Sequence, residues 1–181
     1  IKITPYRVDH SAFDAYLFLV EAEGKRILHT GDFRDHGYTE IDFLSTLEKI
    51  GKIDALICEG TMLSRSGEDV LTEQALQEKA RAIMEKHKRV FVLCSSTNID
   101  RLRAFYQAKP KDRPAVCDFH QKNVLDLVEE HDTTKKYCFK WVVPDSGGNW
   151  KLHDWMDEKG FMMFVRDNER FRKFMAHYRG D

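Results

Sequence analysis

The sequence predicts an α/β protein, and two patterns along its 181 residues lead to this prediction. Up to about Glu59 the apolar residues form short strand-like runs. From about Gly60 such runs alternate with segments whose apolar residues recur at helical spacing. Alternation of strands and helices favours a parallel sheet with helices on its faces. We therefore expect two domains, residues 1–64 and residues 65–181.

The first half is predicted to be strand-rich. Two strands, 16–21 and 26–30, flank Glu23-Gly24-Lys25, where glycine can adopt the positive φ of a hairpin turn. Apolar residues near helical spacing predict a helix within 39–51. The run 53–58 is mostly apolar, as expected of a strand buried on both faces.

The second half is predicted to alternate. Its expected strands are 90–94, 114–119 and 161–165. Its expected helices cover 72–88, the segment that begins at the capping residue Asn98, 121–131, and the residues around 171–178. The stretch 144–149 is the clearest loop.

Composition indicates an ordinary cytoplasmic domain, with 42% hydrophobic and 33% charged residues. No apolar run approaches the roughly 18 residues of a membrane-spanning helix, so no membrane partner is expected. A formal net charge of −1 means that any contact with nucleic acid must come from a local patch. The four cysteines form no CxxC pair, which disfavours a zinc knuckle and predicts buried free thiols, Cys58 and Cys117 among them.

Two short strings place candidate metal ligands at strand ends. Val8-Asp9-His10-Ser11 and His29-Thr30-Gly31-Asp32-Phe33-Arg34 each place a candidate ligand at the end of a predicted strand, just before a tight turn. Imidazole and carboxylate are ligands suited to zinc or a similar divalent ion, so His10 and Asp32 are the candidates. Ordinary turn formation is the alternative for both residues.

These strings resemble the third and fourth metal-binding motifs of the metallo-β-lactamase superfamily. The longer string from Gly24 to Arg34 is typical of its β-CASP branch, which includes ribonuclease J and RNA cleavage factors. Cys58-Glu59-Gly60-Thr61 matches the first β-CASP motif. The resemblance implies the C-terminal part of an αββα core in residues 1–64, followed by a parallel, Rossmann-like βα domain in residues 65–181.

The resemblance also implies a chemistry, namely hydrolysis of phosphodiesters assisted by two divalent metal ions, expected to be zinc. His10 would bind one ion, Asp32 would bridge both, and Glu59 would orient a downstream histidine. A strand-end acid that caps the next turn is the alternative for Glu59. The HxHxDH loop that supplies most ligands does not occur here. We therefore expect an internal piece of such an enzyme, inactive by itself and without bound metal.

Nucleic acid, with RNA favoured, is the implied substrate. Ser96, Thr97, Asn98 and Arg101 lie where a strand ends and a helix begins, a junction whose backbone N–H groups and dipole favour phosphate. Ordinary N-capping is the alternative. The basic cluster of Lys109, Lys111 and Arg113 and the three tryptophans can also be interpreted as nucleic-acid contacts. Solvated charge and core packing, respectively, are the favoured alternatives for them.

Two other functions stay open at this point. The fold hosts many chemistries, so hydrolysis of another ester or phosphoester is one. A non-catalytic β-CASP scaffold subunit is the other, although the presence of His10 and Asp32 argues against it. Loss of half a sandwich would expose sheet faces and strand edges, which favours a homo-oligomer.

Overall fold

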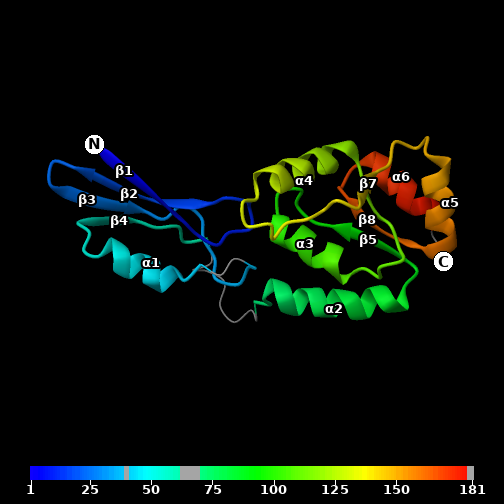
Figure 1. Cartoon of the computed structure of the whole chain (residues 1–181), viewed down its shortest axis with the longest axis horizontal. Helices are drawn as coiled ribbons and strands as arrows, with labels where there is room; N and C mark the ends of the chain where they lie inside the picture. The colour runs from blue at the N-terminus through cyan, green and yellow to red at the C-terminus, as the bar shows by residue number, and fades with distance from the viewer. Residues whose placement is uncertain (39–40, 62–69, 179–181) are drawn as a thin grey trace. The chain divides into compact units, whose positions relative to one another are not determined.

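The computed structural model describes residues 1–38, 41–61 and 70–178 (Figure 1). The chain divides into two compact units, Ile1–Glu73 and Gln74–Asp181. Both units combine strands with helices, and the second contains a wholly parallel sheet, so the prediction of an α/β fold is confirmed. The expected domain boundary between residues 64 and 65 lies outside the described residues.

The first unit contains a four-stranded sheet of order β1-β2-β3-β4. Its strands are β1 (Lys2–Arg7), β2 (Tyr16–Ala22), β3 (Lys25–His29) and β4 (Ala55–Ile57). The first three strands form antiparallel pairs, and β4 runs parallel to β3. Helix α1 (Phe43–Ile50) provides the connection that a parallel pair requires. Asp42 caps this helix by accepting a hydrogen bond from the Ser45 amide.

One face of this sheet packs on α1 and the other is exposed. Leu17, Leu19 and Leu28 alternate with outward-facing neighbours and are buried with Ile50 of the helix. The opposite face carries exposed apolar side chains from all four strands, namely Ile3, Phe18, Ile27 and Ile57. An apolar sheet face of this kind marks an interaction surface.

The prediction that the strand within 53–58 is buried on both faces is wrong. All three residues of β4 are exposed, because β4 is the edge strand and pairs only with β3. Cys58 is exposed as well, whereas Cys117 is buried as expected. Ala55 and Ile57 belong to the exposed face of the sheet, whereas Leu56 pairs with Leu28 on the other face and is still 56% exposed.

The second unit is built on a parallel sheet of order β5-β8-β6-β7. Its strands are β5 (Arg89–Leu93), β6 (Ala115–Cys117), β7 (Val142–Pro144) and β8 (Phe161–Val165). The helices from residue 73 onward are α2 (Glu73–Lys86), α3 (Ile99–Ala108), α4 (Phe119–His131), α5 (Trp150–Lys159) and α6 (Glu169–His177). None of the helices in the described part of the chain is long and apolar enough to cross a membrane.

Helices cover both faces of this sheet (Figure 1). The connections through α3 and α4 run in one direction along the sheet and the connection through α5 runs back. Right-handed crossovers therefore place α5 on the opposite face from α3 and α4. Phe161, Met163 and Val165 pack with residues of α5 and α6. All five residues of β8 are buried, as a central strand between two helix layers requires.

The sequence patterns missed β7 and α5. Only Leu152 and Met156 of α5 are buried, while Trp150 and Trp155 are exposed, so the helix shows no clear apolar stripe. Its N-cap is Asn149, the last residue of the predicted loop 144–149. Asn98 caps α3 by accepting a hydrogen bond from the Arg101 amide, as predicted.

We predict that Gly160→Ala destabilises the second unit strongly. Gly160 ends α5 with φ +80°, and a Cβ there would lie 1.9 Å from the carbonyl oxygen of Lys88. Strain and overlap together are expected to cost about 3 kcal/mol or more in chemical denaturation. Gly147→Ala is the control, because Gly147 has φ +86° but no atom within 4 Å of its Cβ position. Equal costs for the two variants would contradict this prediction.

Candidate functional site

The three candidate residues of the first unit lie at one edge of its sheet. Strands β1 and β3 are both antiparallel to β2, and β4 is parallel to β3, so β1, β3 and β4 end at the same edge. His10 follows β1, Asp32 follows β3 and Glu59 follows β4. The topology therefore brings an imidazole and two carboxylates, widely separated in sequence, to a common edge.

Backbone contacts fix the turn that carries Asp32. The Thr30 amide donates to the Ile57 carbonyl at 2.9 Å, which continues the pairing of β3 with β4. The next residue, Gly31, has φ +58°, and a Cβ there would lie 3.0 Å from the Tyr16 carbonyl oxygen. The positive φ and the close backbone contact together favour glycine at this position. The Asp32 side chain that follows is exposed.

Glu59 is tied to the same turn by hydrogen bonds. Its Oε1 accepts the Phe33 amide at 3.0 Å, and its Oε2 accepts the Thr61 hydroxyl at 2.6 Å. The Thr61 hydroxyl, then the Phe33 amide and, more weakly, the charge of His10 lower the pKa of Glu59. Glu59 is therefore a carboxylate at neutral pH. The bond to Thr61 is the contact that the turn-capping alternative predicts.

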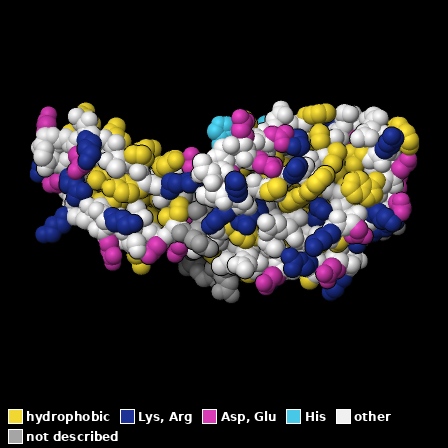
Figure 2. Space-filling view, viewed as in Figure 1, with side chains coloured by type: hydrophobic (Ala, Val, Ile, Leu, Met, Phe, Trp, Pro, Cys, Tyr) yellow, Lys and Arg dark blue, Asp and Glu magenta, His cyan; other side chains and the backbone are white. Residues whose placement is uncertain are grey.

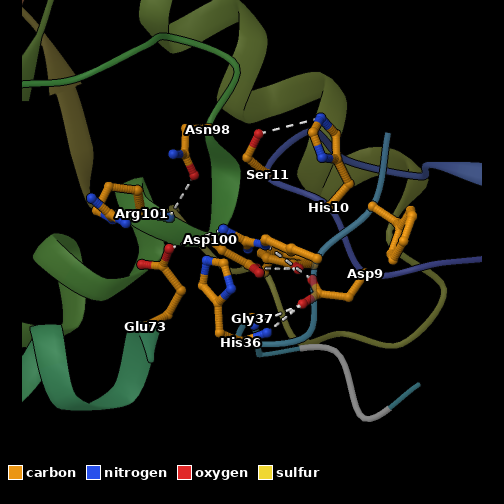
Figure 3. A network of polar contacts seen from close by, with 12 residues as sticks. Asp9, His10, Ser11, His36, Gly37, Glu73, Asn98, Asp100 and Arg101 are labelled. Atoms are coloured by element: carbon orange, nitrogen blue, oxygen red, sulfur yellow. Dashed lines mark hydrogen bonds and ion pairs between the residues drawn. The ribbon is translucent and has the colours of Figure 1, made fainter. Parts of the chain in front are cut away.

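A buried cluster of three charged side chains, Asp9, Arg34 and Glu73, lies next in sequence to, or in contact with, the turns that carry His10 and Asp32. The Asp9 carboxylate accepts the backbone amides of His36 at 3.1 Å and Gly37 at 2.7 Å (Figure 3). Its other oxygen lies 3.3 Å from Nε of Arg34, whose Nη1 donates to Glu73 at 3.0 Å. The three side chains are only 3%, 9% and 0% exposed for Asp9, Arg34 and Glu73.

This cluster connects the two turns of the site. Asp9 directly precedes His10, and Arg34 follows Asp32 by two residues. The Arg34 amide also donates to the Asp9 carbonyl at 2.8 Å. Such contacts orient the neighbouring ligand residues, here His10 and Asp32, without contacting a metal themselves. The sequence gives no sign of this cluster, because Glu73 lies 39 residues from Arg34 and no pattern pairs them.

The donor types at this edge suit zinc, but their number is small. Among the described residues, no group of three or more His, Cys, Asp or Glu side chains is arranged to hold a metal ion. His10 Nε2 lies 3.4 Å from the Ser11 hydroxyl (Figure 3). A catalytic zinc site takes three protein ligands, so His10 and Asp32 form part of a set at most.

The candidate phosphate contacts belong to the second unit. They follow β5, where the Thr97 amide and hydroxyl both contact the Ser95 hydroxyl, at 3.4 Å and 3.1 Å. Asn98 is occupied as the N-cap of α3, and the Ser96 carbonyl accepts Nε2 of Gln121 at 3.2 Å. Ser96, Thr97, Asn98 and Arg101 are thus close along the start of one helix, and ordinary capping accounts for Asn98.

An ion pair that the sequence does not reveal lies at this edge of the second sheet. Asp118 follows β6 and pairs with Arg166, which follows β8. Burial alone would raise the pKa of Asp118, but the Gln121 amide and the Arg166 guanidinium hold it below its usual value. Ligands of parallel α/β sheets bind outside the carboxyl ends of the strands, so this pair belongs to the region where a substrate contact is expected.

Comparison with known proteins supports the fold and leaves the activity open. No family model matches this chain, and no curated protein matches it. The crystal structure of a protein of unknown function from Enterococcus faecalis V583 is similar, with a TM-score of 0.66 and 18% sequence identity. The similarity covers 94% of this chain and 42% of that protein. The chain therefore spans less than half the length of this structural relative.

We predict that Arg34→Met is severely destabilising, because it removes the guanidinium that contacts the buried Asp9 and Glu73 carboxylates. Such losses cost about 3–5 kcal/mol, measured as the change in unfolding free energy. Arg7→Met is the matched control, since Arg7 pairs with Asp14 at the surface and such pairs contribute less than about 1 kcal/mol. A similar cost for both variants would show that the buried cluster has no special role.

We predict that the stabilising effect of Glu59 depends on pH. The pKa of Glu59 is lower in the folded state than its ordinary value of 4.5. Its contribution is therefore present above pH 4.5 and is lost as the pH falls through the folded-state pKa. In urea denaturation, the stability difference between the unsubstituted chain and Glu59→Gln should shrink below pH 4.5.

The Thr61→Val variant sharpens this experiment. It removes the hydrogen bond that lowers the Glu59 pKa most and leaves the bond from Phe33 in place. The stability difference between the unsubstituted chain and Thr61→Val should therefore also shrink below pH 4.5, but by less than the difference for Glu59→Gln. A difference between the unsubstituted chain and Glu59→Gln that stays constant across the acid range would contradict the prediction.

Proposed function

We propose that this chain is part of a metal-dependent phosphodiesterase of the metallo-β-lactamase superfamily, β-CASP branch, that cleaves RNA in the cytoplasm. The observation that carries the proposal is the gathering of His10, Asp32 and Glu59 at one edge of the first sheet. The sequence resemblance assigns roles to these same three residues. Their common position is what a single reaction site requires.

The chain's own residues have distinct roles in this proposal. His10 and Asp32 provide an imidazole and a carboxylate to a pair of zinc ions, whose further ligands come from elsewhere in a longer protein. Such ions, when bound, lower the pKa of water and stabilise charge on a scissile phosphate. Glu59, held ionised by Thr61 and Phe33, accepts a hydrogen bond from a histidine that assists the leaving group. Asp9 and Arg34 hold the two ligand turns together.

Two features of the fold support the proposal. The exposed apolar face of the first sheet, with Ile3, Phe18 and Ile27, suits burial by the second sheet of an αββα core. The second unit is a parallel sheet covered by helices, the architecture that the resemblance implies for a β-CASP domain. In this proposal Ser96, Thr97 and Arg101 contact the RNA backbone beyond the carboxyl end of β5.

The test is cleavage of labelled single-stranded RNA and DNA by the longer protein that contains this chain, with zinc or manganese added. We predict metal-dependent cleavage of RNA, with a rate that falls by more than about 100-fold in Asp32→Ala. Mutation of a residue that only supports a metal ligand already lowers metal affinity or activity about 10–100-fold. Asp35→Ala is the matched control, because Asp35 is an exposed carboxylate in the same turn region. It should leave the rate unchanged.

Metal analysis of the same samples separates the alternatives. Bound metal without cleavage of either polymer would overturn the nuclease proposal and favour another ester or phosphoester. Absence of both metal and cleavage would favour a scaffold subunit. Equal losses in Asp32→Ala and Asp35→Ala would remove the specific role of Asp32.

A further inference from the structure

The second unit has a cleft of about 420 Å³ at the edge where its parallel strands begin. Pro114 and Trp141 directly precede β6 and β7, so the cleft lies at the opposite edge of the sheet from Ser96 and Asp118, which follow β5 and β6. The cleft is lined by Tyr106, Gln107, Lys109, Lys111, Arg113, Pro114, Trp141 and Trp155. It is separate from the candidate phosphate contacts described above.

Two tryptophans line this cleft and remain accessible. Trp141 is 72% exposed and Trp155 is 42% exposed, so the expectation that the tryptophans pack in the core is wrong. Figure 2 shows hydrophobic side chains gathered on the visible face of this unit with Lys and Arg side chains beside them. Exposed indole rings forgo a large gain from burial, and such rings in a cleft mark a surface for a planar ligand.

Cationic groups lie beside the indole rings. Lys109 is half-buried and donates to the carbonyls of Pro110 at 3.3 Å and Arg113 at 2.8 Å. An ammonium has three donors, so these two bonds use two of them. Nζ of Lys109 also lies 5.7 Å from the centre of the Tyr106 ring, which lines the same cleft. Burial lowers the pKa of Lys109, and an anion in the cleft would offset that penalty. Lys111 is exposed and lines the cleft. The acidic residue Asp112 lies between Lys111 and Arg113 in the sequence.

The loop that carries these cations is fixed before any ligand binds. Nη1 of Arg113 donates to the carbonyls of Met84 at 2.7 Å and His87 at 2.6 Å, at the end of α2. Lys109 closes the same loop through its bond to the Arg113 carbonyl. Binding therefore does not have to order the loop, which lowers the entropic cost of association.

We propose that this cleft binds a nucleotide, with its base on the indole rings of Trp141 and Trp155 and its phosphate on Lys109 and Lys111. Stacking on aromatic side chains accepts any base because every base has a planar face. The cleft volume lies within the range of small-molecule sites. The inference goes beyond the proposed nuclease activity and does not depend on it, since no metal-ligand candidate takes part.

Calorimetric titration of the chain with three ligands tests this proposal. Adenosine monophosphate supplies base and phosphate, ribose 5-phosphate supplies phosphate without a base, and a short oligoadenylate supplies nucleotides within a strand. We expect saturable binding of adenosine monophosphate and at least tenfold weaker binding of ribose 5-phosphate. Tighter binding of the oligoadenylate would identify single-stranded nucleic acid as the source of the nucleotide, and equal binding would identify the free nucleotide.

Variants assign the binding to the cleft. Trp155→Ala and Lys111→Glu should each weaken binding about tenfold, as loss of one stacking ring or one phosphate contact does. Trp155→Phe keeps a ring and should lose less than about threefold. The matched controls are Trp150→Ala and Lys151→Glu, an exposed ring–ammonium pair 5.5 Å apart that does not line the cleft. Both controls should bind as the unsubstituted chain does.

Three results would overturn the proposal. The first is absence of saturable binding of both adenosine monophosphate and oligoadenylate at millimolar concentration. The second is equal affinity for ribose 5-phosphate, which would remove the role of the rings. The third is equal weakening in the cleft variants and the controls. Failure of RNA cleavage by the longer protein would leave all three readouts unaffected, so the two proposals fail separately.

Discussion

The buried guanidinium of Arg34 is the interaction on which the first unit depends. Removing a charge from water is costly, and burial of three charged side chains is tolerated only because each meets a partner. Arg34 contacts Asp9 on one side and Glu73 on the other. The cluster has two carboxylates and one guanidinium, and backbone donors help to stabilise the extra negative charge, since Asp9 also accepts the amides of His36 and Gly37. The cluster thereby fixes the segment from Arg34 to Gly37, which begins two residues after Asp32, to the turn that carries His10.

A comparable device occurs in the second unit, where Asp118 combines an N-cap, a buried position and an ion pair with Arg166. In each unit a carboxylate at the end of a strand accepts backbone amides and meets an arginine from a distant segment. Strand ends and helix starts leave donors unpaired, so a carboxylate is the natural group to satisfy them. Asp9 and Asp118 therefore fix the backbone at the ends of the two sheets. Asp32, by contrast, is exposed and accessible to a ligand.

The parts of this structure that follow from local pattern could be predicted, and those that need a distant partner could not. Asn98 caps α3 because its side chain satisfies an amide three residues away, which the sequence displays. The exposure of β4 was not predictable, because an apolar run does not reveal whether a strand is central or at an edge. Arg34 and Glu73 meet across 39 residues, a separation at which single-sequence patterns carry no signal.

The two edges of the second sheet differ in how much of their chemistry the fold itself uses. At the starting edge, Arg113 and Lys109 satisfy carbonyls of the loop and of the end of α2, as cations near helix C-termini do. This role accounts for most of their donors. It does not account for Lys111 at the rim or for two indole rings exposed in one cleft. Exposed indole rings lower solubility without stabilising the fold, so a ligand explains them best. The lysines that line the same cleft select a ligand that is anionic as well as planar.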